Sequence, residues 1–157
     1  MAGALVVVAT IVPNIVGTLG TKRTLVGALV LFAGGLIWLA ASPSNAGFLV
    51  NILGPSILIG IGLGGVFVLG TQLSVDGVKE GDAGLAGGLV NTSQEIGGAL
   101  GLAVLASIAT ARTGALEAVK VPAADALTSG FSWVFLGAAA FALIATGMVA
   151  IGAKDAR

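Results

Sequence analysis

The sequence predicts an all-α protein: a polytopic membrane helix bundle of about five transmembrane helices, forming a single membrane domain over residues 1–157. Three observations lead to this prediction. Hydrophobic residues make up 57% of the 157 residues and charged residues only 9%, whereas an ordinary soluble domain carries about 25% charged residues. The mean hydropathy is +1.10. The charged residues also gather in short clusters that separate long apolar segments.

Five charge-poor segments are each long enough to cross a membrane: about 2–20, 24–42, 47–72, 84–109 and 129–152. A spanning helix needs about 20 residues at about 1.5 Å per residue. The segments are continuous apolar runs rather than alternating ten-residue strands, which favours helices over a closed barrel.

The first segment is predicted to be a span rather than a signal peptide. Its first charge is Lys22, so it lacks a basic leading region, and no A-x-A-like cleavage site lies near its end. Pro13 predicts a kink within it, beside the polar Asn14. The second segment ends at a tight turn that contains Pro43.

The third segment is rich in glycine. Pro55 predicts a kink there, and Gly60, Gly62 and Gly65 formally match the G-x-G-x-x-G pattern of dinucleotide sites. Such a site needs a preceding strand within a soluble βαβ unit. A glycine-lined face for close helix packing is therefore the better interpretation.

The fourth segment carries a stripe of small and polar residues. At about 100° per residue this stripe occupies one face, and large apolar residues occupy the opposite face. Small residues allow close approach of another helix, and amides can hydrogen-bond across the interface. The large apolar face suits lipid. The stripe consists of Gly84, Gly87, Gly88, Asn91, Gln94, Glu95 and Gly98.

Glu95 is the charged residue that lies inside an apolar segment. It lies roughly 15 Å into the span, near the midplane of a ~30 Å hydrocarbon core. An unpaired carboxylate there costs at least ~2.5 kcal/mol, so it must be paired, protonated or in contact with water. One interpretation is a proton-coupling or substrate-contacting carboxylate in a cavity. The other is a packing carboxyl bonded to Gln94, Asn91 or backbone; for both amides, interhelical hydrogen bonding is favoured.

Several function classes are excluded by composition. The chain has no His, Cys or Tyr, which excludes a histidine base, a Cys or His metal site, a thiol nucleophile and disulfides within it. Seven basic residues balance seven acidic ones, so there is no nucleic-acid footprint. We expect no catalytic residue, no cofactor and no metal site.

Basic residues predict the orientation. Two lie on one side, Arg112 and Lys120, and five on the other: Lys22, Arg23, Lys79, Lys154 and Arg157. The bias predicts a cytoplasmic C-terminus, with residues 110–128 as an external loop. Trp38 and Trp133 would then lie near the outer ends of their helices, as an interfacial belt requires.

Two motifs resemble those of a known family. The run Gly81–Leu105, with Asn91, Gln94 and Glu95 at its centre, resembles a signature of the fourteen-spanner drug:proton antiporters of the major facilitator superfamily. Pro13–Arg23 resembles the C-half copy of that superfamily's loop motif, G-x-L-A-D-R-x-G-R-R. Gly20 matches its second glycine and Lys22 a basic position, with Arg23 following. This copy is degenerate, since the first glycine, the acidic residue and the arginine are replaced by Pro13, Gly17 and Thr18.

The resemblance covers essentially the whole chain and implies the last five helices of a major facilitator fold in a bacterial cytoplasmic membrane. It implies the C-terminal portion of a proton-coupled multidrug efflux transporter, which binds amphipathic or cationic compounds between two halves. Its partners would be the lipid bilayer, protons, the substrate, and the missing N-terminal half or a partner chain. The candidate residues are Asn91, Gln94 and Glu95 for the cavity, Gly60, Gly62, Gly84, Gly87 and Gly98 for helix packing, and Gly20, Lys22 and Arg23 for the loop motif.

Other functions remain open from the sequence. One is a short structural or accessory membrane protein, and another is a non-functional truncated product. A homo-oligomeric minimal transporter ranks behind these, and a membrane enzyme behind that. Met1 enters an apolar segment almost at once, as an internal start or a truncated gene model would, so we expect a piece of a longer protein.

Overall fold

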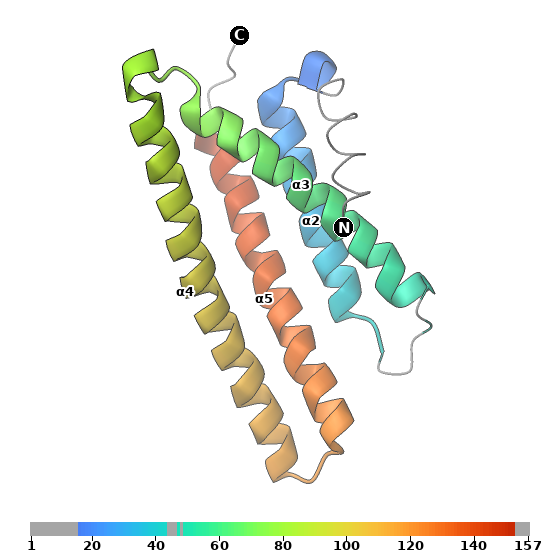
Figure 1. The fold of residues 1–157 in the computed structure, drawn as a ribbon. Coiled ribbons are helices and arrows are strands. Elements are labelled where there is room, and N and C mark those ends of the chain that lie inside the picture. Colours follow the sequence, from blue (N-terminus) through green and yellow to red (C-terminus); the bar gives the residue numbers. More distant parts are fainter. Residues whose placement is uncertain (1–15, 44–46, 48, 153–157) are drawn as a thin grey trace.

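The computed structural model describes residues 16–43, 47 and 49–152. These residues form helices joined by short turns, without a strand among them (Figure 1). The main helices are α2 (Thr21–Ala40), α3 (Gly54–Val75), α4 (Ala83–Ala118) and α5 (Ala123–Gly152). In this described part, four helices are long and apolar enough to cross a membrane. The predicted all-α membrane bundle is confirmed, while the predicted span 2–20, with Pro13 and Asn14, lies almost entirely outside the described residues.

The helix α2 occupies the centre of the bundle. It packs against α3 and against α5, and α4 lies along the far side of α5 (Figure 1). The apolar core joins Leu25 and Leu29 of α2 to the fully buried Leu69 of α3. Residues packed around it include Val66, Leu73, Ala145 and Val149. This core holds α2, α3 and α5 together, and it includes no residue of α4.

Glycines bring α2 and α3 into close contact. A Cβ atom on Gly35 of α2 would lie 3.0 Å from the Ile59 backbone nitrogen. A Cβ on Gly65 of α3 would lie 2.9 Å from the Ala28 Cβ atom. Real Cβ atoms need more room than this, so the two backbones approach as closely as they do because these positions lack side chains. The G-x-G-x-x-G run is therefore part of a helix interface, and no strand precedes it in the described chain.

Pro55, the residue predicted to kink the third segment, lies near the start of α3. It lies in the first turn of α3, directly after a π-helical turn at Leu49–Leu53. It therefore stands where the π-helical turn passes into α3 within one helical stretch, Leu49–Val75, and both prolines and π-turns are places where helices bend. The turn is tied back to α2, because the Ser42 hydroxyl donates a 3.0 Å hydrogen bond to the Asn51 carbonyl oxygen.

The hairpin between α4 and α5 corrects the predicted external loop at 110–128. The two helices are joined by residues 119–122 alone, since α4 continues to Ala118 and α5 begins at Ala123. Residues 115–118 read Ala-Leu-Glu-Ala, and all of these are strong helix formers. Loss of hydrophobicity marks where a chain leaves the membrane, but it does not mark where a helix ends.

The extra helical turns make α4 longer than the hydrocarbon core of a bilayer is thick. The 36 residues of α4 span about 54 Å, against a hydrocarbon core of about 30 Å. Trp38 lies near the end of α2, whereas Trp133 lies ten residues inside α5. If both tryptophans mark the same interface, the tip of the α4–α5 hairpin projects about 15 Å past it.

Candidate functional site

Helix α4 is the most exposed element of the bundle. None of its residues is buried, although it is long and apolar enough to span a membrane. Its second half packs on α5, where a Cβ on Gly137 would lie 2.8 Å from Leu105 Cδ2. Arg112 Nε also donates a 3.3 Å hydrogen bond to the Ser129 hydroxyl. The first half of α4, which carries the polar stripe, is therefore the part without a continuous partner.

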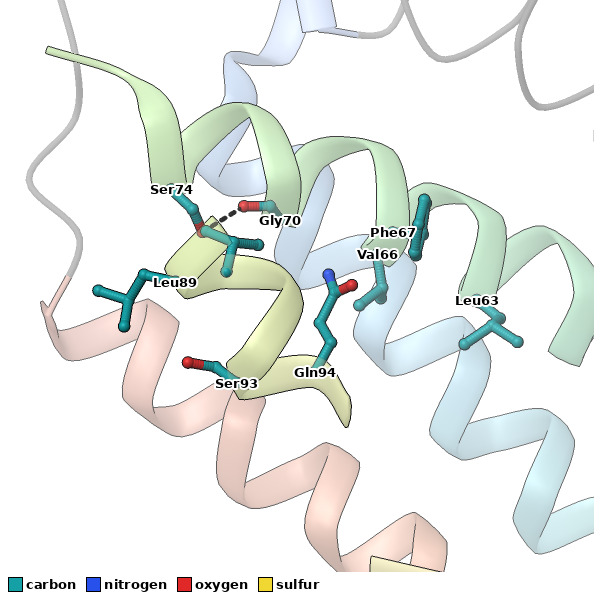
Figure 2. Close-up of a pocket in the computed structure, with 9 residues that line it drawn as sticks. Leu63, Val66, Phe67, Gly70, Ser74, Leu89, Ser93 and Gln94 are labelled. Atoms are coloured by element: carbon teal, nitrogen blue, oxygen red, sulfur yellow. Dashed lines mark hydrogen bonds between the residues drawn. The ribbon is translucent and has the colours of Figure 1, made fainter. Parts of the chain in front are cut away.

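A pocket opens where the first half of α4 faces α3. Its volume is about 770 Å³. Figure 2 shows the residues that line it on α3 and α4, with Gln94 reaching from α4 toward α3. We call it the α3–α4 pocket; it is lined by Leu63, Val66, Phe67, Gly70 and Ser74 from α3 and by Leu89, Val90, Ser93 and Gln94 from α4.

Gln94 is the predicted cavity residue that lines this pocket. Its side chain extends from α4 toward α3, beside Val66 and Phe67 (Figure 2). It follows from helical spacing that Val90 and Gln94, four residues apart, lie on one face of α4. The pocket thus combines apolar walls with a carboxamide, a group that both donates and accepts hydrogen bonds.

Asn91 and Glu95 are not brought to the pocket. Both side chains are exposed, and neither is among the residues that line it. The helical wheel places the two on one side of α4, but α3 approaches only the edge of that face which carries Gln94. The predicted grouping of all three residues in one cavity is therefore not formed within the described chain.

The glycines of α4 have no neighbour among the described residues. A Cβ atom on Gly84, Gly87 or Gly98 would meet nothing within 4 Å. In contrast, Gly62 of α3 is buried against α2, where a Cβ would lie 2.6 Å from the Phe32 nitrogen. Gly60, in the same helix, is half-buried. Close packing through glycine therefore occurs on α3, while the glycine face of α4 remains open.

The predicted loop-motif residues lie at the start of α2. Gly20 has a φ of 81°, a left-handed conformation that glycine adopts at little cost, and it separates the short helical stretch 16–19 from α2. Lys22 is half-buried and Arg23 is exposed. Nearby, a smaller pocket of about 400 Å³ includes Thr21, Gln72 and Asp76. Pro13, which belongs to the loop motif, lies outside the described residues. Lys154 and Arg157, near the C-terminus, lie outside them too.

Sequence reasoning missed most of the pocket. It did not single out Phe67 or Leu63, because apolar residues surround the middle of α3 and give no preferred face, and it did not single out Ser93 of α4. The signal that was available is local: Ser74 and Ser93 are hydroxyl residues within apolar spans.

Among the described residues there is also no cluster of three acidic side chains that would hold a metal ion.

Comparison with known proteins finds antibiotic export and resistance proteins among the relatives of this chain. The chain is 34% identical to the cephamycin export protein CmcT of Amycolatopsis lactamdurans, over 88% of this chain and 27% of that protein. It is 32% identical to the puromycin resistance protein pur8 of Streptomyces alboniger, over 78% and 25% respectively. It is 30% identical to the tetracenomycin C resistance and export protein of Streptomyces glaucescens, over 73% and 21%.

These matches cover a small part of each relative. No protein-family model matches the chain, and no solved structure matches it. The chain spans about a quarter of the length of the curated relatives it matches. Its apolar helices and its exporter relatives together identify an integral membrane protein that is similar to part of the antibiotic export and resistance proteins of actinomycete bacteria.

Proposed function

We propose that the chain is the C-terminal portion of a proton-coupled drug efflux transporter of the major facilitator superfamily, of the fourteen-span antiporter type. Its substrates would be small amphipathic antibiotics, its home the bacterial cytoplasmic membrane, and its C-terminus cytoplasmic. The relatives support the export of antibiotics, since two of them are named as export proteins and one as an antibiotic resistance protein. The resemblance at Gly81–Leu105 supports the antiporter type.

The observation that carries the proposal is the open polar stripe of α4. A spanning helix that presents Asn91 and Glu95 to hydrocarbon is costly, and such residues normally face a bundle interior or a water-filled cavity. No described helix covers them. The three quarters of each relative that this chain does not match would supply a second half of the transporter. A cavity between the halves would then place Asn91 and Glu95 on its wall.

The mechanism that follows is alternating access. The two halves would rock about a substrate held near the midplane, so the site opens first to the cytoplasm and then to the outside. Gln94 would contact the substrate from the α3–α4 pocket, and the exposed glycines of α4 would let the other half slide past without side-chain collisions. Glu95 would exchange a proton during this cycle.

The test is an export assay on the longest product that the reading frame encodes. This product is expressed in a host that lacks its own efflux pumps, and the accumulation of puromycin is followed with and without a protonophore. We expect lower accumulation than in the empty-vector host, and we expect the protonophore to remove the difference. Unchanged accumulation by a membrane-inserted product would overturn the proposal and favour an accessory or non-functional chain.

A further inference from the structure

We propose that the α3–α4 pocket binds the uncharged, largely apolar ring system of a ligand, that the Gln94 carboxamide orients it by hydrogen bonds, and that the pocket excludes cations. The inference rests on the proposed function, because it concerns the compound that the transporter carries. It narrows the compounds that bind at this site from amphipathic or cationic ones to uncharged ones.

The size and walls of the pocket fit a drug-sized ring system. Its volume of about 770 Å³ falls within the range of about 300–1,000 Å³ typical of small-molecule sites. Phe67, which is 62% exposed, supplies an aromatic ring to this wall, and aromatic rings attract other rings in stacked or edge-to-face arrangements. The aliphatic part of the wall consists of Leu63, Val66, Leu89 and Val90.

The hydrogen-bonding capacity of the pocket is concentrated in α4. The Ser74 hydroxyl donates to the Gly70 carbonyl at 2.7 Å, so its hydrogen is already used within α3 (Figure 2). The Thr92 hydroxyl of α4 likewise donates to the Gly88 carbonyl at 2.9 Å. Ser93 and Gln94 make no such bond with any described residue. Their polar atoms are therefore available to a ligand.

The absence of charge on the lining residues sets the selectivity. None of the nine residues that line the pocket carries a formal charge. A cation moved from water into an apolar site without a counter-charge loses solvation that a single amide dipole does not replace. Glu95, the adjacent carboxylate, belongs to the exposed stripe and does not line the pocket. An uncharged ring loses little solvation and gains contact with the apolar wall.

The chain contains no cysteine, which allows a direct test by single-cysteine labelling. Ser93→Cys places a thiol in the pocket. Thr92→Cys places a matched thiol on the same helix, one residue away and outside the pocket. Each variant of the 157-residue chain is reconstituted in phosphatidylcholine nanodiscs and reacted with methyl methanethiosulfonate. The probes are N-phenyl-1-naphthylamine, which is uncharged, and the tetraphenylphosphonium cation.

We expect the uncharged probe to slow labelling at position 93 and not at position 92. At a probe concentration about four times its dissociation constant, the labelling rate should fall about fivefold. The cation should protect neither position. Gln94→Leu keeps the side-chain bulk but removes the hydrogen bonds, so it should weaken protection, and Gln94→Glu should make the cation protective. The labelling rate at position 92 in the same backgrounds shows whether α4 is still folded.

Three results would overturn the proposal. Equal protection at positions 92 and 93 would show partition into lipid only. Equal protection by the cation would remove the charge selectivity. Full protection in the Gln94→Leu background would remove the role of the amide. The labelling experiment and the export assay test different claims. Selective binding of the uncharged probe without drug export would contradict the proposed function alone. Drug export without selective binding would contradict the proposed ligand of the pocket alone.

Discussion

Gly62 of α3 lies directly against the backbone at Phe32 of α2. A Cβ atom on Gly62 would come within 2.6 Å of the Phe32 nitrogen and within 2.8 Å of the Ala28 carbonyl oxygen. Both obstacles are backbone atoms, so no side-chain rotation can relieve the collision. Gly62, together with Gly35 and Gly65, therefore sets the separation of α2 and α3, and with it the position of the α3 wall of the pocket.

Gly62→Ala should destabilise the bundle by about 1–3 kcal/mol, the usual cost of overpacking a well-packed interface. Thermal unfolding in detergent, followed by circular dichroism, measures the change. The matched control is Gly70→Ala on the same helix, where a Cβ would meet nothing within 4 Å. If both variants unfold at the same temperature, the close α2–α3 contact is wrong.

Gly130→Ala should weaken the α4–α5 hairpin more than Gly137→Ala does. A Cβ on Gly130 would collide with the Thr113 hydroxyl and lie 3.0 Å from the Ala109 carbonyl oxygen, whereas at Gly137 the obstacle is the mobile δ-methyl of Leu105. We expect about 1–3 kcal/mol for the first substitution and less than about 1.5 kcal/mol for the second. Unfolding in mixed micelles with increasing dodecyl sulfate ranks the two; the reverse order would contradict the packing described here.

Glu95→Gln should slow proton-driven efflux by the export-competent product at least tenfold, which corresponds to about 1.4 kcal/mol. The amide keeps the size of the side chain but cannot exchange a proton. The measurement is the initial rate of substrate efflux at a fixed pH gradient. Glu117→Gln, near the exposed end of α4, is the matched control and should leave the rate unchanged. If the Glu95→Gln variant exported substrate at the normal rate, Glu95 would not couple proton movement to export, although the protein would still be an exporter.

The predicted orientation makes opposite loops accessible from opposite sides. Val119 lies in the α4–α5 turn and is 70% exposed, while Lys79 lies in the turn between α3 and α4. In intact cells, a membrane-impermeant maleimide should label Val119→Cys and not Lys79→Cys, and permeabilisation should expose the second. The opposite labelling pattern would reverse the topology.

The helices themselves could be predicted because each one needs only local information. Charge clusters bound the apolar segments, and segment length separates a span from a turn. The end of α4 could not be predicted in the same way, because residues beyond the charge-poor segment, such as Ala115 and Ala118, continue a helix for reasons of propensity.

The candidate site was predicted only in part because it depends on how two helices approach. The spacing on α4 placed Asn91, Gln94 and Glu95 within one broad face. Which edge of that face meets α3 is decided by the packing of α3 on α2 and of α4 on α5, and no local pattern encodes it. Phe67 could not be distinguished within α3, where glycines and aliphatic residues occur on all sides.

The exposed face of α4 also bears on the lifetime of the chain in a cell. A membrane helix whose amide and carboxyl groups find no partner is poorly solvated by lipid, and it resembles an unassembled subunit. Whatever covers Asn91 and Glu95 would therefore act as a chaperone in the thermodynamic sense, since binding to the folded chain lowers its free energy. The steady-state amount of this chain becomes a measure of assembly: it should rise when the covering segment is present and fall when that segment is withheld.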